Sequence, residues 1–155
     1  MKHRASYPLF IAVCLAGSSL PAFAQTTQAQ CETITLQGMN GQGGIDRQLP
    51  RELASSLSHP PHSSYNSWRQ LSRSTRAATV GQPFGVQLPN ANTIQVTWRM
   101  GPRNDQALLE FGLLEAGRTN VLPLVRSAVR WGEFILVGGQ HYRGTHLVLA
   151  TRCTR

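Results

Sequence analysis

Two cysteines bracket the folded part of this 155-residue chain: Cys31 stands near its start and Cys153 two residues from its end. The third cysteine, Cys14, belongs to an N-terminal leader. In an oxidising compartment such an even pair predicts one disulfide. The bond would join the first and last elements and close nearly the whole domain, which the chain-entropy model values at about 4–5 kcal/mol. Two unpaired thiols are the alternative, and without a Cys-x-x-Cys spacing a redox-active pair is not indicated.

The leader decides the compartment. A basic start (residues 1–4), an apolar run (residues 9–16) and an Ala-x-Ala end at Ala24 are typical of a secretory signal peptide over residues 1–24. The run is too short to span a bilayer, which argues against an uncleaved anchor. We therefore expect a protein exported to the periplasm or the exterior, with a flexible tail over residues 25–30, a single β-rich domain over residues 31–155, and no membrane span after cleavage.

Alternating apolar and polar residues dominate the domain. The cleanest case is residues 93–100, where Ile94, Val96 and Trp98 alternate with polar neighbours, as in a half-buried strand. One helix is expected near residues 50–57, where leucines repeat every four residues and form an apolar stripe suited to packing on a sheet. Short strands separated by turns, with one early helix, predict a mainly β fold: an antiparallel β-sandwich or a partly closed barrel.

Several packing and turn positions are similar to those of a loosely defined group of small exported bacterial proteins of unknown function. They are Gly44-Ile45-Asp46, Tyr65-Asn66-Ser67-Trp68 with Leu71, Leu88-Pro89, and Leu136-Val137-Gly138-Gly139 followed by Tyr142, Gly144 and Leu147. The resemblance covers most of the domain. It implies an exported β-rich domain and brings no activity with it.

Charge is the next clue. Without the leader, 13 arginines and no lysine stand against seven acidic residues, so the net charge is +6. Arginine binds carboxylates and phosphates in bidentate fashion. A genome rich in G and C also favours arginine codons without any functional reason, and the arginines are spread along the chain, which weakens a nucleic-acid footprint.

A binding surface is predicted where arginines and aromatic residues coincide. Arg69 and Arg73 are expected to share one strand face, and Arg126 and Arg130 another, while Trp98 is expected in the core with Arg99 outside. A second candidate is the glycine-rich segment 138–144, read as a loop with three polar and aromatic side chains at its tip. The predicted surface comprises Arg69, Arg73, Arg99, Arg126, Arg130, His141, Tyr142 and Arg143.

Catalytic and metal-binding patterns are weak. The four histidines of the domain (His59, His62, His141 and His146) lack carboxylate neighbours and helical spacing, so no metal ligands or cofactor are predicted. His62 beside Ser63-Ser64 could be assembled into a hydrolase triad only on paper, because no Gly-x-Ser-x-Gly surrounds either serine. No catalytic residues are predicted.

The sequence thus favours a non-enzymatic accessory or protein-interaction module of the bacterial envelope or exterior, whose partner is another envelope or extracellular protein. The main alternative is an electrostatic binder of anionic polymer: envelope polysaccharide, lipopolysaccharide or extracellular nucleic acid. A small hydrolase is a distant third. Salt separates the first two, because a polymer contact weakens steeply with ionic strength.

Overall fold

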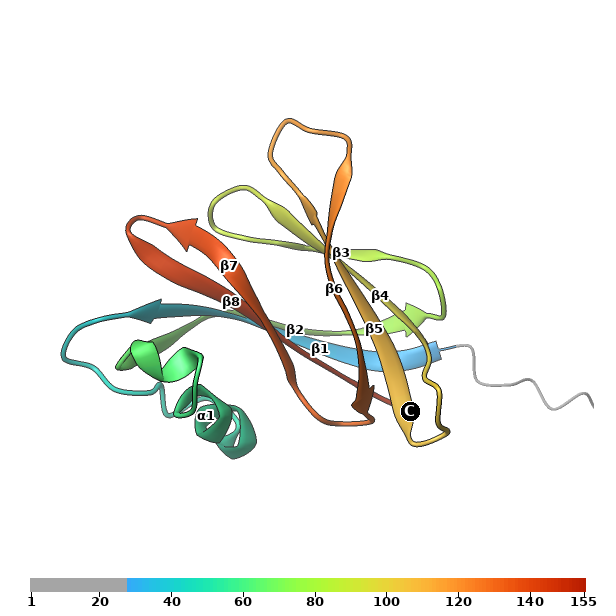
Figure 1. Ribbon diagram of the computed structural model, residues 1–155, viewed down its shortest axis with the longest axis horizontal. Helices are drawn as coiled ribbons and strands as arrows, with labels where there is room; N and C mark the ends of the chain where they lie inside the picture. Colours follow the sequence, from blue (N-terminus) through green and yellow to red (C-terminus); the bar gives the residue numbers. More distant parts are fainter. Residues whose placement is uncertain (1–27) are drawn as a thin grey trace, which may run out of the picture.

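The computed structural model describes residues 28–155, and the predicted signal peptide lies outside that range. The chain folds into two four-stranded antiparallel sheets (Figure 1). The first sheet has the order β2-β1-β8-β7, with β1 (Gln28–Met39), β2 (Ser67–Thr79), β7 (Ile135–Tyr142) and β8 (Thr145–Thr154). The second has the order β3-β4-β5-β6, with β3 (Phe84–Gln87), β4 (Thr93–Met100), β5 (Gln106–Leu114) and β6 (Val121–Arg130).

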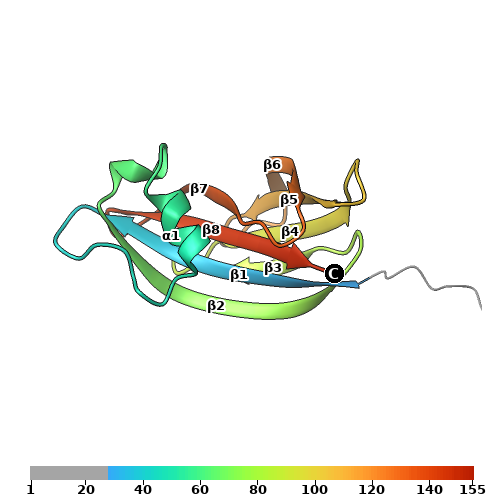
Figure 2. The same cartoon turned by 90° about the horizontal axis from the view of Figure 1, so that it is seen from below.

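The predicted mainly β fold is confirmed, and the two separate sheets make it a β-sandwich rather than a barrel. Helix α1 (Arg51–Leu57) and the short 3-10 turn η1 (His62–Ser64) form a third layer, which lies on the face of the first sheet that points away from the second (Figure 2). The first sheet is therefore covered on both faces. The outer face of the second sheet has no such cover in the described part of the chain.

Helix α1 begins within a residue of its predicted start, after Pro50, and Glu52 stands in its first turn, where the helix dipole favours a carboxylate. Seven residues are too few for a helix that is stable alone, so packing must hold it. The predicted leucine stripe does this: Leu49, Leu53 and Leu57 are buried against the first sheet. Their partners in this cluster are Ile34, Leu36, Trp68, Val148 and Ala150.

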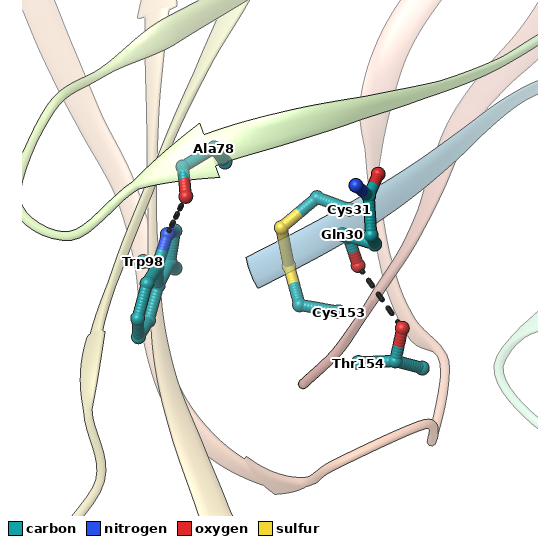
Figure 3. Close-up of a disulfide and its surroundings, with 6 residues drawn as sticks. All are labelled: Gln30, Cys31, Ala78, Trp98, Cys153 and Thr154. Atoms are coloured by element: carbon teal, nitrogen blue, oxygen red, sulfur yellow. Dashed lines mark hydrogen bonds between the residues drawn. A yellow bond between two sulfur atoms is a disulfide. The ribbon is translucent and has the colours of Figure 1, made fainter. Parts of the chain in front are cut away.

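A larger apolar core fills the space between the two sheets, built from the inward phase of each strand. In β4 the inward residues are Ile94, Val96 and Trp98, as the alternation predicted. The Trp98 side chain is buried, and its indole N–H donates to the Ala78 carbonyl at 2.8 Å (Figure 3). Trp98 is thus a core residue and not a contact residue, as expected.

The predicted disulfide is present. Cys31 on β1 and Cys153 on β8 lie directly opposite each other in neighbouring strands, with their Cα atoms 4.1 Å apart (Figure 3). Both side chains are buried at the end of the inter-sheet core. The bond links residues 122 positions apart and fixes the register of the first and last strands.

Two boundaries differ from the sequence prediction. Strand β1 begins at Gln28, inside the segment predicted as a flexible tail, because Ala29 is buried against the inter-sheet core and pairs with Ala78. The segment 138–144, predicted as a loop, is mostly strand. Strand β7 continues to Tyr142 through a bulge at Gly138 and Gly139, and residues 143–144 alone make the turn.

No helix within residues 28–155 is long and apolar enough to cross a membrane.

Removing the disulfide is expected to lower the free energy of unfolding by about 4–5 kcal/mol, because the unfolded chain then regains the freedom of a loop of more than a hundred residues. The variant Cys31→Ala/Cys153→Ala and the reduced wild-type protein should both show this loss in urea titrations. A loss below about 1 kcal/mol in both would contradict the expected role of the bond.

Candidate interaction surface

Three of the predicted surface arginines meet on the outer face of the second sheet. Arg126 pairs with Glu110 across the β5–β6 ladder and Arg130 with Gln106, so the two arginines share a face, as predicted. The Glu110 carboxylate accepts from Arg99 Nε at 3.1 Å and lies 3.2 Å from Arg126 Nε. Two guanidinium groups thus share one carboxylate, which leaves this face with an excess of positive charge.

Strand β6 exposes an apolar run beside these arginines. Of the five exposed large apolar side chains in residues 28–155, four lie on β6: Val121, Leu122, Leu124 and Val125, each 38–48% exposed. In a soluble monomer, apolar side chains exposed together in this way mark an interaction site more often than isolated ones do. Strand β6 is also the edge of the second sheet, so one side of its backbone lacks a strand partner in the described chain.

A β-bulge shapes this part of the surface. Val125 pairs with Phe111 and Pro123 with the next residue, Gly112, so Leu124 is the extra residue of β6. A side chain at Gly112 would collide with Val121, since a Cβ there would lie 2.4 Å from its Cγ1. Next to the bulge is a cavity of about 350 Å³, lined by Glu110, Phe111, Pro123, Leu124, Val125 and Arg126.

The prediction that Arg69 and Arg73 share a face is wrong. Arg69 pairs with Gln37 and Arg73 with Ile34, and these two β1 residues point to opposite faces of the first sheet. The cause is a bulge in β2 next to Leu71, which shifts the alternation by one residue. Arg73 therefore faces the helix layer, and Arg69 does not join it.

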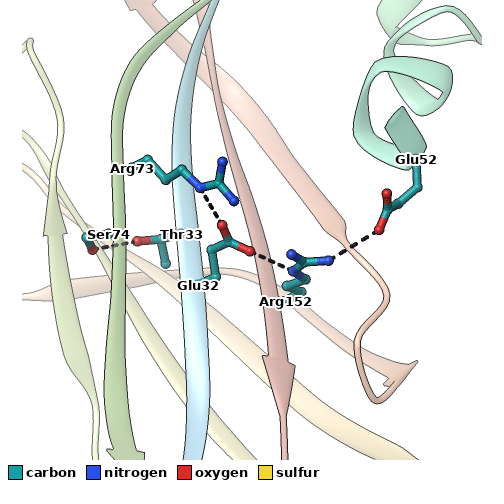
Figure 4. A network of polar contacts seen from close by, with 6 residues as sticks. All are labelled: Glu32, Thr33, Glu52, Arg73, Ser74 and Arg152. Atoms are coloured by element: carbon teal, nitrogen blue, oxygen red, sulfur yellow. Dashed lines mark hydrogen bonds and ion pairs between the residues drawn. The ribbon is translucent and has the colours of Figure 1, made fainter. Parts of the chain in front are cut away.

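Arg73 belongs to an ion-pair network that ties three strands to the helix (Figure 4). The Glu32 side chain, 9% exposed, accepts from Arg73 Nε at 2.5 Å and from Arg152 Nε at 2.6 Å. Arg152 Nη1 also donates to Glu52 on α1 at 3.2 Å. Because both Glu32 oxygens are engaged, Arg73 has a structural role, and its place in the predicted binding surface gains no support.

The β7–β8 hairpin holds the other predicted residues. Tyr142 packs against the inter-sheet core, and the guanidinium of Arg143 lies over the Tyr142 ring, 5.2 Å from its centroid. His141 is exposed, and its carbonyl accepts from Asn90 Nδ2 at 3.3 Å. The three residues therefore do not form one outward-facing tip: Arg143 occupies the turn, with φ of 51°, while His141 and Tyr142 lie in the strand.

An aromatic cluster flanks this hairpin at the end of the helix layer. The rings of Tyr65 and His146 are stacked with centroids 5.2 Å apart, His141 meets His146 edge-on at 5.6 Å, and His62 meets Trp68 edge-on at 6.0 Å. Burial lowers the pKa of His62. Burial, and then the neighbouring imidazoles of His141 and His62, lower the pKa of His146. The environment of the cluster thus disfavours the protonated forms of His62 and His146.

The geometry adds nothing to the hydrolase hypothesis. Ser64 Oγ donates to the Pro61 carbonyl at 3.1 Å, and within residues 28–155 His62 makes no hydrogen bond to Ser63 or Ser64. Across the same residues, no group of three or more His, Cys, Asp or Glu side chains is placed so that it could hold a metal ion.

The exposure of β6 was not predicted, although the sequence contains one signal of it. A continuous apolar run such as Val121-Leu122-Pro123-Leu124-Val125 is typical of a strand buried on both faces. Pro123 cannot donate to a ladder, however, and within sheets proline is confined mainly to edge strands and bulges. Pro123 lies in an edge strand and next to the bulge at Leu124, so the proline could have identified the run as an apolar edge.

Comparisons of the chain with protein-family models, with curated protein sequences and with solved structures found no match.

Replacing the buried carboxylate in Glu32→Gln is expected to lower the free energy of unfolding by about 1–3 kcal/mol, because two charge-assisted hydrogen bonds lose their charged acceptor. Urea titration at pH 7 measures the loss. The matched control is Glu115→Gln, which breaks the exposed pair with Arg118 and should change the free energy by less than about 0.5 kcal/mol. Equal losses in the two variants would contradict the role assigned to Glu32.

The depressed pKa of His146 predicts a loss of stability in acid. The unfolded chain takes up a proton near the ordinary histidine value of about 6.5, before the folded state does, so stability is complete above that pH and declines as the pH falls below it. His146→Phe, which keeps a ring against Tyr65, should therefore show a smaller drop in unfolding free energy between pH 8 and pH 5 than the wild type. Parallel curves for the two proteins would exclude this contribution.

Proposed function

We propose that this protein is an exported, non-enzymatic interaction module that binds another envelope or extracellular protein through β6 and the adjoining outer face of the second sheet. The observation behind the proposal is the apolar run of β6, exposed beside Arg126 and Arg130. Apolar side chains with a cationic rim match the anatomy of protein interfaces, in which arginine is enriched and an apolar centre is desolvated.

The uneven cover of the two sheets supports the same surface. The outer face of the first sheet packs against α1, whereas the outer face of the second sheet is available. The shared carboxylate of Glu110 lies on this outer face, and the apolar β6 run and the 350 Å³ cavity border it. Val121 and Pro123 share the outward phase, whereas Leu122 and Val125 pair with the core residues Leu113 and Phe111 and are exposed at the edge of the inter-sheet side. A partner that fits this region would cover apolar area and meet the excess positive charge in one contact.

Export is supported by two independent features. The sequence begins with a leader typical of secretion, and the Cys31–Cys153 disulfide is a bond that persists in oxidising compartments. Both features support a module of the envelope or exterior.

Binding of an anionic polymer is the competing function, and its support is the net charge. Ion pairs reduce the positive charge available to a polymer: Arg99 and Arg126 share Glu110, and Arg73 and Arg152 share Glu32. An apolar edge strand has no role in such binding, since counterion release depends on the cations alone.

A capture experiment with paired variants tests the two functions. Mature protein is immobilised through its C-terminus and incubated with native envelope extract and culture medium. The β6 variant Leu122→Ser/Leu124→Ser is treated in the same way. The control is Met100→Ser, because the Met100 side chain is also solvent-exposed but lies at the end of β4. We expect a stoichiometric protein that stays bound at high salt, is lost with the β6 variant and is kept with the control.

The other outcomes are equally clear. Recovery of polyanions alone, all released at moderate salt and bound equally by the three proteins, would replace the proposed function with polymer binding. A protein captured equally by all three would show that β6 is not the contact.

A further inference from the structure

The four edge strands of the sandwich are protected to very different degrees. Edge strands need protection because their unpaired backbone groups can join another strand. Strand β2 carries Arg69, Arg73 and Arg76 among serines and threonines, β3 has four residues, and β7 is interrupted by its glycine bulge. Strand β6 is ten residues long and apolar over half its length, and its protection consists of Pro123, the bulge at Leu124 and two arginines. All six residues from Val125 to Arg130 pair regularly with β5.

We infer that the free edge of β6 accepts an extended acidic segment of the partner protein as an added β-strand. This inference rests on the proposed function and specifies how the partner binds. Strand addition satisfies the free backbone groups of an edge, and side-chain positions at every second residue supply the specificity. The expected ligand is a segment with carboxylates on one face and apolar side chains on the other.

The alternation of side chains between the two faces of β6 determines which face of the added strand should be acidic. Arg126 and Arg130 lie on the outer face, in register with Glu110 and Gln106, whereas Val129 lies on the opposite face and packs against the inter-sheet core. An added strand therefore places one set of side chains beside the arginines and the other beside the core. Arg126 and Arg130 are about 13 Å apart along the strand, so acidic residues four positions apart would reach both.

Charge decides between this occupant and a second copy of the chain. Pairing β6 with the β6 of another copy would bring Arg126 and Arg130 of both copies onto one face, where like charges repel. The nearest carboxylates, Glu110 and Glu133, are already paired with these arginines, at 3.2 Å and 3.8 Å. Glu110 also pairs with Arg99, so these three arginines exceed their two carboxylates by one positive charge. A strand with its own carboxylates supplies the missing negative charge, whereas a second copy adds further positive charge.

The test uses the mature, disulfide-bonded protein and three synthetic ten-residue peptides. The first alternates valine and glutamate, the second has the same composition with glutamates on both faces, and the third repeats the first with N-methyl groups along one edge. We expect the alternating peptide to bind and to slow amide exchange in β6. The second peptide should bind about tenfold more weakly, as the loss of two cross-strand charge pairs implies, and the N-methylated peptide should not bind.

Variants locate the contact. Arg126→Ser/Arg130→Ser should weaken binding of the alternating peptide about tenfold for the same reason, while Arg118→Ser, in the turn before β6, should leave it unchanged. Both variants are checked for unaltered unfolding in urea, so that a loss of binding cannot reflect a loss of fold.

The inference is overturned if the alternating peptide does not bind, if the N-methylated peptide binds equally well, or if exchange slows elsewhere than in β6. Dimerisation of the protein through β6 in sedimentation would overturn it in favour of a second copy. In each case the proposed function stands or falls separately, because capture that depends on Leu122 and Leu124 does not require strand addition.

Discussion

The pairing of β1 with β8, closed by the Cys31–Cys153 disulfide, is the constraint on which the rest of the structure depends. Strand β1 is central in its sheet and buried on both faces: Cys31 points into the inter-sheet core, while Ile34 and Leu36 point to the helix. A strand in this position links three layers. The Glu32 carboxylate of this strand is buried too, and two arginines compensate its charge.

The two sheets differ in how much of their surface is packed. Both faces of the first sheet are packed, and its Arg73 and Arg152 form ion pairs with Glu32. The second sheet packs with one face only, and its edge strand β6 presents apolar side chains to solvent. The proposed binding surface therefore lies on the sheet that contributes least to the layered core, where a partner would not disturb the disulfide-closed strands.

Sequence alone predicted the parts that depend on local periodicity or on simple counting. The alternation at Ile94, Val96 and Trp98, the leucine stripe of α1 and the terminal cysteine pair all match the structure. Two of the failures share one physical cause. A β-bulge inserts one residue and reverses the side-chain phase beyond it, so Arg69 and Arg73 were placed on one face, and the bulged end of β7 was taken for a loop. Exposure of β6 has a different cause, because it depends on strand order, a long-range property for which Pro123 was the one local signal.

The two arginines of β6 have a double consequence for specificity. An apolar edge without charge would pair with the same edge of another copy, and with many other strands besides. Arg126 and Arg130 make self-pairing unfavourable through repulsion, and the same charges favour a strand that carries carboxylates at the matching positions. In the proposed mode of binding, one pair of residues thus discriminates against a second copy of the protein and in favour of an acidic partner. Replacing both by serine should consequently weaken acidic-peptide binding and promote self-association at high protein concentration, a combination that a purely structural role for these arginines does not produce.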